Sequence, residues 1–80
     1  MKVKDIVAER FLKICKERGI KLNELANVSG VTPSTVYSMV DPSRRDISIT
    51  TIKKLCDGLG ITLGEFFSAS EFDSLDQEIY

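Results

Sequence analysis

The sequence contains no histidine and two cysteines, Cys15 and Cys56, which lie far apart and form no Cys-x-x-Cys motif. Zinc sites draw their ligands mainly from these two residue types, so we expect neither a bound metal nor a cofactor. Both cysteines fall on apolar faces of predicted helices. A free cysteine on such a face behaves as a small hydrophobic residue, and we predict buried free thiols without a functional role.

Long apolar runs are also missing. None approaches the roughly 20 residues of a membrane-spanning helix, and the first five residues are not followed by the apolar core of a signal peptide. We therefore expect a cytoplasmic protein that does not associate with membranes. The sequence has no glycine-rich phosphate-binding loop, and its acidic residues are scattered over predicted solvent-facing positions. With no histidine base beside a nucleophile, we do not expect an enzyme.

Positive charge is confined to one part of the chain, whose formal net charge is −1. Residues 1–64 hold all 11 Lys and Arg against 7 acids, a net charge of +4, whereas residues 65–80 hold 5 acids and no base, a net charge of −5. We therefore expect a domain over residues 1–68 and an acidic C-terminal tail over residues 69–80. The field near one face matters more for a charged partner than the total charge.

Strand-like alternation and internal repeats are absent, whereas apolar residues recur at helical spacing along most of the chain. The pattern predicts five short helices in an all-α fold. The first three cover residues 3–18, 21–28 and 33–40; the fourth runs from a cap at Ser48 or Thr50 to about Leu59; the fifth follows the Thr62-Leu-Gly-Glu65 capping box and runs through Phe67.

Apolar and charged residues divide the first helix into two faces. The inward stripe comprises Val3, Ile6, Val7, Phe11, Leu12, Ile14 and Cys15. The outward face comprises Lys4, Glu9, Arg10, Lys13, Lys16 and Glu17, of which the lysines are expected to be ordinary solvent-exposed surface. In the fourth helix the inward positions are Ile49, Ile52, Leu55, Cys56 and Leu59.

Residues 21–40 predict two helices joined by a tight turn, and the rest of the chain is arranged around them. Ala26 is small enough for a second helix to cross close to it, and Gly30 can adopt the left-handed conformation that ends a helix. Thr32 is a favourable cap and Pro33 a favourable first residue for the next helix. Val36 then fills the crossing. This spacing is typical of a helix-turn-helix, whose second helix enters the DNA major groove.

The chain resembles the Cro/C1-type (XRE-family) helix-turn-helix regulators over roughly residues 6–67. Five segments carry the resemblance: Leu25-Ala26, Ser29-Gly30-Val31, Thr32-Pro-Ser-Thr-Val36, Ile52-Lys-Lys-Leu-Cys56 and Gly58-Leu-Gly-Ile-Thr-Leu63. The resemblance implies a five-helix lambda-repressor-like fold that binds operator DNA as a dimer and often represses transcription. The departures are Leu22 in place of a phosphate-binding Gln, Val40 in place of Glu, and Pro42 and Ile47 in place of Gly and Pro in the loop.

The third helix offers small polar side chains to DNA. With Val36, Met39 and Val40 facing inward, the residues expected to contact bases are Pro33, Ser34, Thr35, Tyr37 and Ser38. Serine can donate to or accept from several bases, and a threonine methyl or proline ring can contact a thymine methyl. Arg, Lys, Asn and Gln are absent from this helix, so base discrimination should be modest and partly dependent on DNA shape and water. The alternative is a merely solvated helix start, with Pro33 acting as a helix starter.

Phosphate contacts, which supply most of the affinity for DNA, are expected from two places. The candidates are Lys21 and Asn23 at the start of the second helix, and Ser43, Arg44 and Arg45 in the polar loop over residues 41–46. Free backbone N–H groups at a helix start also attract anions. The alternative for the two arginines is that they are solvated surface or pair with Asp41 and Asp46.

The leading interpretation is a sequence-specific regulator that represses transcription and binds double-stranded DNA as a homodimer, with its two third helices about 34 Å apart. Phe66 is expected in the core, whereas Phe67 and an apolar edge of Phe72, Leu75 and Ile79 are compatible with either core or dimer contacts. The alternative is a protein-interaction module of the same fold, such as an antitoxin-like or anti-repressor partner. The acidic tail and the lack of strong base readers favour that alternative.

Overall fold

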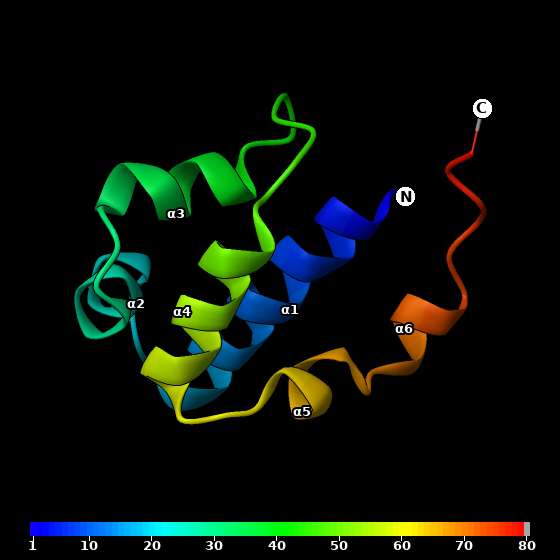
Figure 1. The fold of residues 1–80 in the computed structure, drawn as a ribbon. Helices are drawn as coiled ribbons and strands as arrows, with labels where there is room; N and C mark the ends of the chain where they lie inside the picture. The colour runs from blue at the N-terminus through cyan, green and yellow to red at the C-terminus, as the bar shows by residue number, and fades with distance from the viewer. Residues whose placement is uncertain (80) are drawn as a thin grey trace.

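Residues 1–79 are described by the computed structural model of this chain, and they form six helices and no strand (Figure 1). The helices are α1 (Val3–Arg18), α2 (Leu22–Ser29), α3 (Pro33–Val40), α4 (Ile49–Leu59), α5 (Leu63–Phe67) and α6 (Ser70–Asp73). α2 packs against α3 and α4, and α1 packs against α2, α3 and α6. The all-α prediction is confirmed. The sequence pattern predicts five helices and does not include α6, because four residues are too few to show a helical period.

The turn between α2 and α3 is closed by Gly30, which has a φ angle of 69°. In this left-handed conformation the N–H of Gly30 donates to the carbonyl of Asn27 (3.4 Å), and the N–H of Val31 donates to that of Ala26 (3.1 Å). These bonds satisfy the last carbonyls of α2. α3 then begins at Pro33, whose fixed φ angle suits a first helical position. The predicted helix-turn-helix is therefore present.

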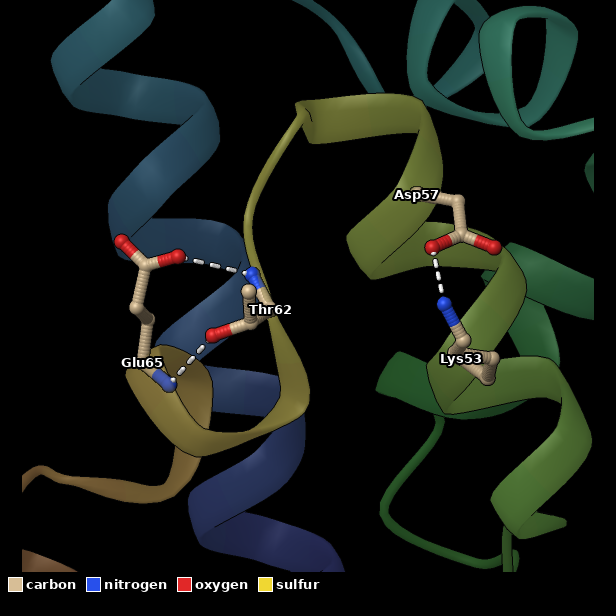
Figure 2. A network of polar contacts seen from close by, with 4 residues as sticks. All are labelled: Lys53, Asp57, Thr62 and Glu65. Atoms are coloured by element: carbon tan, nitrogen blue, oxygen red, sulfur yellow. Dashed lines mark hydrogen bonds and ion pairs between the residues drawn. The ribbon is translucent and has the colours of Figure 1, made fainter.

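Side chains cap the two helices that follow. The N–H of Thr51 donates to Ser48 Oγ (3.0 Å), so Ser48 rather than Thr50 caps α4. At α5 the N–H of Glu65 donates to Thr62 Oγ1 (3.0 Å), and the N–H of Thr62 donates to Glu65 Oε1 (2.9 Å), as Figure 2 shows. The predicted capping box is confirmed, and its hydrogen bonds, chiefly the backbone one, hold the pKa of Glu65 below its usual range.

One hydrophobic core holds the helices together. Phe11, Leu25, Val36, Leu55 and Phe66 have no solvent-exposed surface. The ring of Phe66 stacks on that of Phe11 with centroids 4.3 Å apart, which confirms Phe66 as a core residue. Burying an aromatic side chain removes the largest apolar area per residue from water, so these two rings tie α5 firmly to α1.

Both cysteines are buried free thiols, as predicted. Burial raises the pKa of Cys15 and of Cys56, because an apolar environment disfavours the thiolate. A thiol with a raised pKa is a poor nucleophile and a poor metal ligand. These side chains therefore serve packing.

Three apolar residues placed inward by the sequence pattern are exposed. Val3 is 44%, Leu12 41% and Ile49 62% exposed. Val3 and Ile49 lie in the first turns of α1 and α4, ahead of the first buried residues of these helices, Lys4 and Ile52. Leu12 lies 100° around α1 from Phe11, at the edge of the stripe. The spacing of apolar residues shows which face of a helix is apolar. It does not show how far along that face the neighbouring helices cover it.

Two basic residues of α1 placed outward by the sequence pattern contact the rest of the domain. Lys4 is buried, and its Nζ donates to the carbonyl of Asp41 (2.6 Å). Arg10 is half-buried; its Nε donates to the carbonyl of Phe66 (2.6 Å), and its Nη2 donates to that of Glu65 (3.2 Å). Both cations bind carbonyls at the ends of other helices, where the helix dipole is negative.

The acidic tail folds back along the body. Phe72 of α6 packs against the core cluster, and its ring centroid lies 5.0 Å from that of Phe67. Ile79 is 85% exposed, so it does not share this packing. Near the C-terminus, Glu78 Oε2 accepts the backbone N–H of Val3 (2.8 Å), which places both chain ends at the same side of the molecule (Figure 1). The last residue of the predicted tail, Tyr80, lies outside the described residues.

Candidate nucleic-acid interface

The third helix has one buried and one exposed face. Val36 is fully buried and Met39 is 2% exposed, and both belong to the core cluster. Val40 is half-buried against the same cluster. On the other side, Pro33, Ser34 and Tyr37 are exposed, and Thr35 and Ser38 are half-buried. In Figure 1 α3 lies above α4 and α5 at the upper left margin of the view, and the loop that follows it rises beside its end. Its outward residues are therefore available to a large ligand.

Three hydroxyl groups meet at the N-terminal end of α3. Thr32 Oγ1 lies 3.0 Å from Ser34 Oγ and 2.9 Å from Thr35 Oγ1. Thr32 is the N-cap residue of α3, as predicted, but its hydroxyl accepts no backbone N–H. The competing hydroxyls of its neighbours explain the difference. Each hydroxyl can both donate and accept, so the cluster keeps free hydrogen-bonding capacity toward a base edge.

An open hollow of about 260 Å³ separates this face from the start of α4. Ser34 and Ser38 line one side of the hollow, and Ser48 and Thr51 line another. Asp46 contributes a carboxylate to the same wall. Hydroxyls and one anion suit a donor group, such as a base amino group, better than a phosphate. The sequence shows this second pair of hydroxyls only as the capping pattern of α4.

The loop after α3 is organised by Asp41. The carboxylate Oδ1 of Asp41 accepts the backbone N–H of Ser43 (2.9 Å) and its hydroxyl (2.8 Å). These two bonds, with the backbone one larger, hold the pKa of Asp41 below its usual range. The N–H of Arg44 donates to the carbonyl of Asp41 (3.1 Å). Because the hydroxyl hydrogen of Ser43 is used internally, that side chain is poorly placed to donate to a phosphate.

Arg44 and Arg45 are exposed, with their side chains outside the hydrogen-bond network of the loop. Within residues 1–79 the ion pair found is between Lys53 and Asp57 on α4 (Figure 2). Neither arginine forms a salt bridge with Asp41 or Asp46, although the charge of Arg44 helps to lower the pKa of Asp41. An unpaired guanidinium at the surface is available for bidentate binding of a phosphate. The structure thus leaves both arginines available beside the C-terminal end of α3.

Lys21 and Asn23 are exposed at the N-terminal end of α2. The backbone N–H of Lys21 donates to Glu24 Oε1 (3.3 Å), so a carboxylate already lies at this helix start. In the described part of the chain, no hydrogen bond joins the side chain of Lys21 or Asn23 to α3. Because α2 packs against α3, its two polar residues remain candidate contacts beside that helix, as do the loop arginines that follow its C-terminal end.

Lys4 is the residue near this surface that the sequence reasoning placed wrongly. It stands seven positions before Phe11 and so shares the buried stripe of α1. The spacing therefore places Lys4 on the buried face, whereas its charge predicts an exposed position. Its partner, the carbonyl of Asp41, is a backbone group that no pattern of side chains indicates.

The described residues contain neither a metal-binding cluster nor a membrane-spanning helix. Residues 1–79 contain no group of three or more Cys, Asp or Glu side chains placed to hold a metal ion. Among the same residues, none of the six helices has the length and apolar character needed to cross a lipid bilayer. A polar, open surface beside an exposed helix is what the molecule offers a partner.

Comparison with known proteins agrees with this geometry. The family profile of the Cro/C1-type HTH DNA-binding domain matches residues 10–71. Control protein C.MunI from Mycoplasma sp is 43% identical over 37 residues, which are 46% of this chain and 50% of that protein. The chain thus spans about half the length of this curated relative.

The fold itself has a solved counterpart. The crystal structure of the prophage Lp1 protein 11 superposes with a TM-score of 0.82 at 27% identity, covering 92% of this chain and 97% of that one. The family profile covers the helix-turn-helix and the helices around it, and the structural match covers nearly the whole chain. This chain belongs to the Cro/C1-type helix-turn-helix family of DNA-binding domains.

Proposed function

We propose that this DNA-binding transcriptional regulator is a repressor that inserts α3 into the major groove of an operator and blocks transcription by occupying the site. The observation that carries the proposal is the two-sided character of α3. Val36 and Met39 fix the helix on the core, while the hydroxyl-rich face around Ser34 stays open beside two unpaired arginines. A helix-turn-helix bound at a promoter can block transcription by steric exclusion alone.

The proposed contacts divide into two classes. Base contacts come from Pro33, Ser34, Thr35, Tyr37 and Ser38, and phosphate contacts come from Lys21, Asn23, Ser43, Arg44 and Arg45. Exposure of Pro33, Ser34 and Tyr37 supports the first set. Exposure of both arginines, without an ion pair to Asp41 or Asp46, supports the second. Ser43 is the weakest member, since its hydroxyl already donates to Asp41.

We further propose that the protein binds DNA as a homodimer, in the cytoplasm and without enzymatic activity. Two copies related by a two-fold axis would place their α3 helices about 34 Å apart, one turn of DNA. Few strong base readers in one copy make a second copy valuable, because two modest half-sites together give a selective site. The lack of histidine in the whole sequence supports a role without acid–base catalysis.

A protein-interaction module on the same fold is the second candidate. The observation that favours it is charge: residues 65–80 carry five acids and no base, which repels DNA and suits a basic protein partner. α3 also lacks the Arg, Lys, Asn and Gln side chains that read bases most strongly.

Selection from a random duplex library separates the two candidates. A repressor should enrich one common, two-fold symmetric site, which a titration should then show to bind two chains, with affinity falling as salt rises. A shuffled duplex of the same composition serves as the control. If no site is enriched, and a duplex in dilute buffer leaves the protein's NMR spectrum unchanged, the chain is a protein-interaction module.

A further inference from the structure

Lys4 is the buried charged residue of the described chain, with 5% of its surface exposed. Its Nζ lies 2.6 Å from the carbonyl oxygen of Asp41. Asp41 is the C-cap residue of α3, so this carbonyl lies directly at the C-terminal end of that helix. A lysine so deeply buried requires a strong partner, because an isolated ammonium group loses much of its hydration there. The pair therefore ties α1 directly to the end of the recognition helix.

The same carbonyl also starts the arginine loop. It accepts the backbone N–H of Arg44 (3.1 Å), while the Asp41 carboxylate binds both the N–H and the hydroxyl of Ser43. One residue, Asp41, thus joins α1, the end of α3 and the segment that carries Arg44 and Arg45. If its carbonyl moved, both the direction of α3 and the start of the loop would change.

Packing does little to hold this loop. A cleft of about 560 Å³ lies beside it, lined by Lys4, Arg44 and Arg45 on one side and by Asp76 and Glu78 of the tail on another. Residues 42–46 are all exposed. With little apolar burial, the position of a loop depends on its hydrogen bonds. The bonds through Asp41 are therefore the ones that set where the arginines lie.

We propose that Lys4 is a positioning residue for DNA binding: by holding the Asp41 carbonyl, it fixes Arg44 and Arg45 in register with α3. Its own ammonium is covered, so it acts through the arginines and not as a phosphate contact. This inference rests on the proposed function, because the arginines are assigned there to phosphates. It adds a residue of α1 to the determinants of affinity.

The test compares Lys4→Met, which keeps the apolar stem and removes the donor, with Lys13→Met, which removes one positive charge from an exposed position of α1. We expect Lys4→Met to weaken binding to the selected duplex by about tenfold. The plot of log K against log salt concentration should also become shallower, its slope falling in magnitude by about 1–2, because phosphate contacts are lost. Lys13→Met should change affinity by less than about twofold, and Lys4→Arg, which can still donate to the carbonyl, should restore most of the loss.

A double-mutant cycle shows whether Lys4 acts through the arginines. Adding Lys4→Met to Arg44→Ala/Arg45→Ala should cost little further affinity, because the groups that it positions are already gone. Additive losses would overturn the proposal, as would equal losses for Lys4→Met and Lys13→Met. If circular dichroism shows that Lys4→Met does not fold, Lys4→Gln takes its place in every comparison, since its amide reaches less far and carries no charge.

A second readout does not depend on DNA. In the NMR spectrum of the free protein, Lys4→Met should shift the amide signals of Asp41 and of residues 43–46, and Lys4→Arg should return most of them toward their original positions. Unshifted loop signals would refute the positioning role even if DNA binding were lost. If the loop signals shift but the unmodified protein binds no duplex, the proposed function fails while the link from Lys4 to the loop stands.

Discussion

The two ends of α3 are built differently. At the N-terminal end, the hydroxyls of Thr32, Ser34 and Thr35 bond to one another within the described chain. At the C-terminal end, Met39 is buried and the carbonyl of Asp41 is bound by Lys4 from another helix. One end is anchored by tertiary contacts, whereas the other keeps its polar groups for a ligand. A helix that reads DNA needs both, since an unanchored reader could not hold its side chains in register with the bases.

The strongest way to test this contrast is to truncate the anchored end. We expect Met39→Ala to lower the free energy of unfolding by about 2–5 kcal/mol, because it opens a cavity in the core. The matched control is Tyr37→Ala, two residues earlier and 51% exposed, which should change stability by no more than about 0.5 kcal/mol. Urea denaturation followed by circular dichroism measures both. Similar losses for the two variants would show that α3 is not anchored on one side.

The next largest effect should come from the loop beside the anchored end. Arg44→Ala/Arg45→Ala should weaken binding to every duplex and lower the salt slope by about 2, as two phosphate contacts are lost. A matched control is Lys53→Ala/Lys54→Ala, which removes two positive charges from the exposed face of α4, where Lys53 pairs with Asp57 (Figure 2). Fluorescence anisotropy over a salt series measures the slope. Equal effects of the two double variants would show that the arginines act only through the total charge of the protein and not through specific phosphate contacts.

Local chemistry explains why the elements of this fold were predictable. Gly30 ends α2 and Pro33 starts α3, as expected from their backbone preferences, and the Thr62 capping box starts α5. The inward positions of α3 followed from helical spacing, and Val36 and Met39 are buried accordingly. These features depend on residues within one or two turns of each other, which a sequence displays directly.

Tertiary partners explain what was not predictable. Lys4 was expected in solvent because it is charged, but its partner is a backbone carbonyl 37 positions further along the chain. Ile49 is expected inside because it is apolar, but the buried part of α4 begins only at Ile52. Such outcomes depend on where a second element begins and ends. The roles assigned to individual α3 and loop residues on DNA remain predictions, since they depend on a partner molecule.

The open face of α3 that carries Ser34 and Ser38 should affect which DNA sequence is bound more than how stably the chain folds. Ser34→Ala/Ser38→Ala removes two hydroxyls from the open face, and each hydrogen bond lost to a base should be worth about 0.5–1.5 kcal/mol. We expect a threefold to tenfold change in preference at one or two base positions (about 1 kcal/mol) and little change in stability. Sequencing of duplexes selected by each protein measures this. An unaltered selection profile would remove these serines from the reading surface.

The smallest expected effect is a pH dependence of the free energy of unfolding, which arises from Asp41 at the anchored end of α3. The ionised carboxylate of Asp41 accepts two hydrogen bonds from Ser43, so its pKa in the folded protein lies below its value in the unfolded chain. The unfolded chain therefore binds the proton more readily, and the stabilisation is fully present above the unfolded pKa, about 3.9. It is lost as the pH falls through the lower, folded pKa.

Asp41→Asn isolates this contribution, because the amide keeps one acceptor oxygen but never ionises. At pH 7 the unmodified protein should be the more stable of the two in urea denaturation, and the difference should shrink steadily below about pH 4. Glu65 has a pKa lowered in the same direction by the capping box, so Glu65→Gln must be carried in both proteins as a background. If the difference in that background does not change with pH, the Asp41 carboxylate contributes no ionisation-dependent stability. The anchored end of α3 would then be held by the Asp41 carbonyl and by the packing of Met39 and Val40 against the core.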